Sequence, residues 1–73
     1  MSTLYDYLED KAFERNMTME QLAHDIGISK ATISRIKHRA PSQTTYHKIG
    51  HKLDISPVTL RKMPIKEDES NDG

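Results

Sequence analysis

The chain has 73 residues, 11 basic and 11 acidic residues, and no cysteine. A chain of this length forms one domain with a small core. Without cysteine it has neither disulfides nor a thiolate zinc site, and no apolar run approaches the roughly 20 residues of a membrane span. The acidic start, MSTLYDYLED, lacks the basic and apolar blocks of a signal peptide, so we expect a cytoplasmic protein.

Charge is distributed unevenly along the sequence. Residues 1–25 carry two basic and six acidic residues, residues 26–53 carry six basic and no acidic residues, and residues 66–73 carry one basic and four acidic residues. A basic segment between acidic ones suits a surface for an anionic ligand, although charge runs are more often solvated helix faces. Charge alone therefore leaves nucleic acid as one of several interpretations.

The first two predicted helices follow from apolar spacing and caps. Leu4, Leu8 and the pair at 12–13 repeat at helical spacing, which predicts a helix that is capped by residue 2 or 3 and ends near Asn16. A second helix begins after Thr18, which forms a capping box with Gln21. Its inner face is formed by Leu22, Ala23 and Ile26. Gly27 ends it, because glycine adopts the left-handed conformation without a side-chain clash.

Two further helices are predicted on either side of Pro41. Ser29 caps the third helix, whose inner residues are Ile33 and Ile36, with Ile28 just ahead of the cap. Ser42 caps the fourth helix, whose inner face is formed by Tyr46, Ile49 and Leu53.

A short fifth helix is predicted after Ser56. Pro57 occupies its first position, Val58 or Leu60 turns inward, and Pro64 ends it. Residues 64–73 show no apolar periodicity and are expected to be a disordered acidic tail, which leaves a domain of residues 1–63. No strand pattern or repeat is present, so the predicted fold class is all-α with five short helices.

The spacing between the second and third helices is the most informative feature. One helix ends at Gly27 and the next begins within three residues, so the two helices must cross steeply. A small residue is needed where the two helices touch. Ala23 is that residue in the second helix, and Ile33 of the third helix is expected to pack against it.

This pattern resembles the helix-turn-helix of the Cro/cI-like (XRE) repressor family, a lambda-repressor-like fold, over about residues 4–62. The resemblance lies in Ala23, Gly27, Ile33, the lead-in T-x-x-x-L-A from Thr18, and the segment KIGHKLDISPVTL. It implies that the helix starting at Lys30 enters the major groove of double-stranded DNA. The implied base contacts are Lys30, Ala31, Ser34 and Arg35. The implied backbone contacts are Thr18, Met19, Gln21, Ser29, Thr32, Lys37, His38, Arg39, Ser42 and Thr44.

The sequence departs from the family pattern at three places. Met19 replaces a glutamine that contacts phosphate, so that contact is expected from the backbone or from Gln21. Ala12 and Lys37 replace a paired arginine and glutamate, which leaves Lys37 free to face DNA. Arg39 replaces a glycine after the recognition helix, and its charge suits the DNA backbone.

The resemblance also implies a homodimer on an inverted-repeat operator, at least when DNA is bound. The expected dimer interface is Asp54, Ile55, Val58, Leu60 and Met63. The predicted function is a transcriptional repressor or regulator of the phage or mobile-element type, with no cofactor. The alternative is an antitoxin or regulatory subunit whose main partner is another protein, such as a toxin or antirepressor.

Metal binding and catalysis are the less favoured interpretations. His47 and His51 are four residues apart in the fourth predicted helix, but no cysteine or nearby acid completes a metal site. No Gly-x-Ser-x-Gly turn or comparable motif holds a nucleophile. We therefore expect neither a metal site nor an enzyme.

Overall fold

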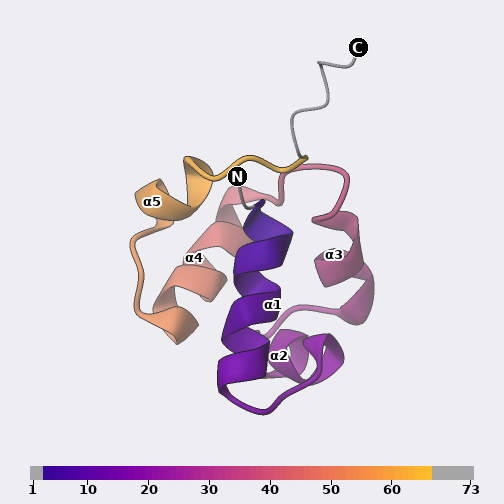
Figure 1. The fold of residues 1–73 in the computed structure, drawn as a ribbon. Helices are drawn as coiled ribbons and strands as arrows, with labels where there is room; N and C mark the ends of the chain where they lie inside the picture. Colours follow the sequence, from indigo (N-terminus) through magenta and orange to yellow (C-terminus); the bar gives the residue numbers. More distant parts are fainter. Residues whose placement is uncertain (1–2, 67–73) are drawn as a thin grey trace.

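The structure, a computed structural model, describes residues 3–66, and in this range every regular element is a helix. The five helices are α1 (Leu4–Glu14), α2 (Met19–Ile26), α3 (Lys30–Arg35), α4 (Gln43–Leu53) and α5 (Pro57–Arg61). Figure 1 shows α1 between α3 on one side and α4 and α5 on the other, with α2 across its lower end. The predicted all-α class with five helices is confirmed.

The helices begin at the positions that their cap residues predict. Thr18 accepts a hydrogen bond from Gln21 N at 3.0 Å, and Gln21 Oε1 accepts one from Thr18 N at 2.9 Å, which completes the capping box. Ser29, Ser42 and Ser56 cap α3, α4 and α5 through their side-chain oxygens. Thr3 caps α1. Gly27 ends α2 in the left-handed conformation, with φ of 97°.

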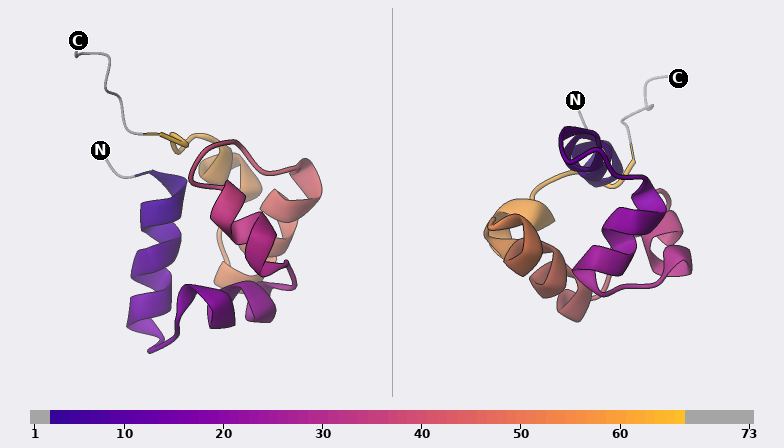
Figure 2. Two further views of the ribbon diagram at one scale, coloured as in Figure 1. Left: turned by 90° about the vertical axis from the view of Figure 1, so that its right-hand side faces the viewer. Right: turned by 90° about the horizontal axis from the view of Figure 1, so that it is seen from below.

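The buried side chains form one core to which every helix contributes. α2 packs against α1, α3 and α4, while α4 also packs against α5. The core consists of Leu4, Leu8, Ala12, Leu22, Ala23, Ile26, Ile33, Ile36, Tyr46, Ile49, Leu53 and Leu60. The left view of Figure 2 shows α2 and α3 at an angle to each other, with α1 to one side and α4 and α5 behind α3. The helix-turn-helix pair is therefore held by the rest of the domain.

Two details of α1 differ from the expectation. The helix ends at Glu14, and Asn16 adopts a left-handed conformation with φ of 58°, so the chain turns earlier than predicted. Phe13 is 83% exposed, whereas Ala12 is buried. Ala12 continues the four-residue row of Leu4 and Leu8, and the next residue is turned about 100° away from that row.

The end of the described chain closes on the start of α1. Leu4 N donates to Pro64 O at 2.8 Å, and Ile65 packs against the core. The packed body therefore extends past Met63, where the sequence places the end of the domain. The sequence predicts a disordered tail over residues 64–73. Pro64 and Ile65 are packed against the domain instead, because they contact α1 and the core, and residues 67–73 lie outside the described residues.

Candidate nucleic-acid interface

The third helix presents one buried side and one exposed side. Ile33 and Ile36 are buried against the core. At about 100° per residue, the opposite side is centred on Ala31, with Ser34 and Arg35 on its two edges. All three side chains are exposed, so three of the four expected base contacts share the outward side of α3.

A row of polar side chains runs from α3 toward the start of α4. The helical turn continues beyond Arg35, because Arg39 N donates to Arg35 O at 3.0 Å. Thr32, Arg35 and Arg39 consequently lie on the same edge and line a cavity of about 250 Å³. The remaining lining residues are Ile36, Ala40, Pro41, Ser42 and Thr45.

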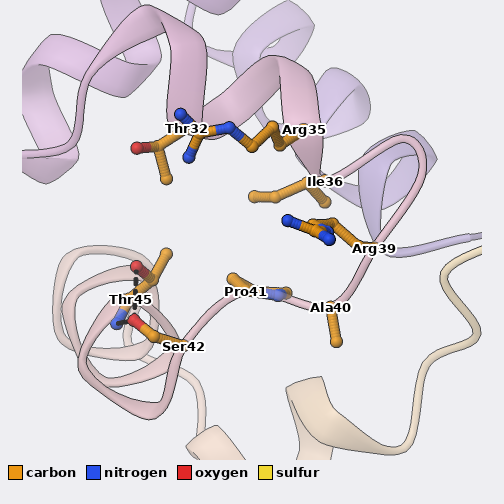
Figure 3. Close-up of a pocket in the computed structure, with 8 residues that line it drawn as sticks. All are labelled: Thr32, Arg35, Ile36, Arg39, Ala40, Pro41, Ser42 and Thr45. Carbon is orange, nitrogen blue, oxygen red and sulfur yellow. Dashed lines mark hydrogen bonds between the residues drawn. The ribbon is translucent and has the colours of Figure 1, made fainter.

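The two arginines of this row, Arg35 and Arg39, carry positive charges without an acidic partner among the described residues. Figure 3 shows Arg35 lying along α3 toward Thr32, while Arg39 points into the space between α3 and the start of α4. Neither guanidinium forms an ion pair with any residue in the range 3–66. Because arginine binds planar anionic groups through two parallel hydrogen bonds, this edge is suited to phosphate oxygens or base acceptors.

The opposite edge of α3 carries cations that already have partners. Lys30 Nζ lies 3.8 Å from Glu20 Oε1, and both side chains are largely exposed. Lys37 Nζ lies 5.0 Å from the ring centroid of Tyr5, a cation–π contact with α1. Lys37 therefore lies against α1, which differs from the expectation that it extends freely toward DNA. The Lys30 pair is exposed and hence weak, so it can give way to a stronger acceptor.

Two lysines of α4 support the turn between α2 and α3. Lys48 Nζ donates to Gly27 O at 3.2 Å, and Lys52 Nζ lies 3.6 Å from Asp25 Oδ2. In the sequence these two lysines are part of the basic segment and nothing assigns them a partner. Their spacing of four residues places them on one helix face, which indicates a shared neighbour.

The residues at helix starts that are expected to contact the DNA backbone are mostly exposed, although several of their hydroxyl groups form the hydrogen bonds that cap the helices. Gln21 uses its Oε1 in the capping box, which leaves its NH2 group as a donor. Ser29 Oγ and Thr32 Oγ1 lie 2.9 Å apart in a hydrogen bond, so half-buried Thr32 supports the cap. Met19 is half-buried against the core, and only its main chain can serve a phosphate. Ser42, Thr44 and His38 are exposed.

The comparisons identify the family of this arrangement. The family model described as helix-turn-helix matches residues 4–60. The chain belongs to the Cro/cI-like (XRE) helix-turn-helix family. Members of this family are DNA-binding regulators, and α2 and α3 are the helix-turn-helix of this one. Searches of curated proteins and of solved structures gave no match.

The predicted dimer residues of this helix-turn-helix protein divide into two groups. Leu60 is fully buried in the core of its own chain and is excluded from the expected interface. Val58 is 51% exposed, Ile55 and Met63 are half-buried, and Asp54 is exposed. Leu60 and Val58 are about 200° apart around α5, so only one of them can face the core, and that one is Leu60.

His47 and His51 are both exposed on α4. Over residues 3–66, no group of three histidine, cysteine, aspartate or glutamate side chains could hold a metal ion. Within the same residues, no helix is both long and apolar enough to span a bilayer.

Proposed function

We propose that the protein is a sequence-specific repressor that places α3 in the major groove of double-stranded DNA. The observation that carries the proposal is the exposed side of α3, where Ala31, Ser34 and Arg35 stand beside a row that ends in Arg39. Arg35 can donate to two acceptors of guanine, Ala31 can contact a thymine methyl group, and Ser34 can donate or accept. Lys30, at the start of the helix, reaches a further base when its exposed pair with Glu20 opens.

The backbone contacts are proposed to surround this reading surface. Arg39, with Ser42 and Thr44 at the start of α4, would bind phosphates on one side of the groove. Gln21 and the amides that follow Thr18 would bind phosphates on the other side. Phosphate contacts position the helix, whereas the contacts from Ala31, Ser34 and Arg35 would select the sequence.

The test is a selection of binding sites from random duplex DNA, followed by affinity measurements on the selected site. Arg35→Ala should weaken specific binding by about 1–3 kcal/mol and relax the preference at one base pair. Arg35→Lys is the matched variant, because it retains the charge and loses the bidentate geometry. An equal loss of affinity for every sequence would show that Arg35 contacts phosphate and would contradict its assigned role.

We also propose that the protein binds as a homodimer on an inverted repeat, with half-site centres about 34 Å apart. One short recognition helix reads only a few base pairs, and a two-fold partner doubles the contacts with the same surface. The exposed Val58, with Asp54, Ile55 and Met63 beside it, is the proposed interface. Footprinting that protects a single half-site, with one protein per duplex at saturation, would overturn this proposal.

One observation supports the alternative function of binding another protein. Phe13 is 83% exposed on α1, and an exposed phenylalanine is a common anchor in protein interfaces. Phe13→Ser should leave DNA affinity unchanged if the main role is DNA binding. A protein that stays monomeric and shows no DNA binding in size-exclusion chromatography, yet binds a partner through Phe13, would favour this second function.

A further inference from the structure

The end of the described chain lies beside the last turn of the recognition segment. Ile65 packs against the core, and Ile65 and Lys66 line a cavity of about 460 Å³. The other residues around this cavity are Thr3, Tyr5, Asp6, Lys37 and His38. The next residue of the sequence, Glu67, therefore follows directly from a position next to Lys37 and His38.

This end of α3 is rich in cations that form no ion pair with an acid in the described range, residues 3–66. Among residues 3–66, Lys37 forms a cation–π contact with the Tyr5 ring and no ion pair, and Arg35 and Arg39, on the opposite edge of α3, form no ion pair either. The Asp6 carboxylate, which lines the same cavity as Lys37, takes part in the cap of α1, because its Oδ2 accepts a hydrogen bond from Thr3 N at 3.1 Å. We call Arg35, Lys37 and Arg39 the cationic end of α3.

The residues that follow Lys66 have the opposite charge. They are Glu67, Asp68, Glu69, Ser70, Asn71 and Asp72, four acids without a base. We propose that residues 67–72 bind the cationic end of α3 in their own chain and compete there with DNA. This inference rests on the proposed DNA-binding function and adds an internal competitor to it.

Reach and local concentration both support the contact. Six residues span at most about 20 Å when extended, at about 3.3–3.6 Å per residue, and the segment starts beside Lys37. A segment tethered this closely has an effective concentration on the order of millimolar. Even a weak charge contact is then well populated at low salt, while screening removes it as the ionic strength rises.

Such a competitor would lower the affinity for every DNA that has to displace it from the cationic end of α3. Non-specific affinity comes almost entirely from phosphate contacts. A random-sequence duplex therefore shows the competition without a contribution from base contacts.

The experiment compares two triple variants with the same change in net charge. The first neutralises the segment: E67Q/D68N/E69Q. The control neutralises three exposed acids of α1: E9Q/D10N/E14Q. Fluorescence anisotropy with a random-sequence duplex measures affinity at about 50 mM and about 300 mM salt. Amide NMR spectra of the same proteins without DNA report on residues 37–39.

The segment variant should bind the duplex about three- to tenfold more tightly at low salt, which is the effect of removing an internal competitor. The control variant should gain less than about twofold, and the difference should disappear at high salt. The amides of residues 37–39 should shift in the segment variant only. Equal gains in the two variants, or unshifted amides, would overturn the inference. If neither the parent nor the two variants bound DNA, the proposed function would be overturned instead. The amide shifts would still show whether the segment binds the cationic end of α3.

Discussion

Replacing Gly50 by alanine should destabilise the domain, although local helix propensity predicts the reverse. Gly50 lies inside α4, where alanine would be favoured over glycine by about 1 kcal/mol. A Cβ atom at this position would lie 2.5 Å from Ile55 O and 3.3 Å from the Pro57 ring. The segment that leads into α5 would have to move away from α4.

The expected cost exceeds the gain in propensity. Overpacking a tight contact costs about 1–3 kcal/mol. The shift would also strain the hydrogen bond from Ile55 N to Gly50 O, now 2.9 Å long, and a typical bond of this kind contributes about 1 kcal/mol. After the propensity gain, we expect a net loss of about 1–3 kcal/mol in the free energy of unfolding. In a domain of this size each kcal/mol lowers the melting temperature by about 4–8 °C.

Urea and thermal unfolding of the two proteins measure this loss. His47→Ala is the matched control, because it introduces alanine at an exposed position of the same helix and should stay within about 0.5 kcal/mol of the parent. A Gly50→Ala protein as stable as the parent would refute the close approach of α5 to α4. It would also remove the reason why this helix pair carries a glycine.

Three further outcomes are expected. Ala23→Leu should lose about 1–3 kcal/mol in thermal unfolding, because the side chain of Ala23 is buried and α2 packs closely on α3 there; unchanged stability would place Ala23 away from the crossing. Gly27→Ala should lower the free energy of unfolding by about 1–2 kcal/mol, because the backbone at this position is left-handed, although nothing lies within 4 Å of the added carbon. Gly27→Asn should lower it less, because asparagine tolerates the left-handed conformation better. Arg39→Ala should weaken binding to all DNA sequences alike and reduce the salt dependence by about one ion; a loss confined to one base pair would contradict a phosphate contact.

Features set by neighbours three or four residues apart could be predicted from the sequence. Thr18 with Gln21, and Ser29, Ser42 and Ser56, cap their helices as expected, because a cap bond joins a side chain to a nearby amide of the same segment. The left-handed Gly27 follows from the same kind of local argument. The five helices, the helix-turn-helix and most of the core depend on such patterns.

The distribution of free charge was decided by the tertiary structure. The sequence shows six cations without an acid between residues 26 and 53, but two of them face acids of α2, Lys48 binds the turn at Gly27, and Lys37 lies on Tyr5. Arg35 and Arg39, along one edge of α3, form no ion pair within residues 3–66. These partners lie 10 to 32 positions apart in the sequence. Which of them meet depends on how the helices cross and which sides they turn to each other, and no local spacing contains that information.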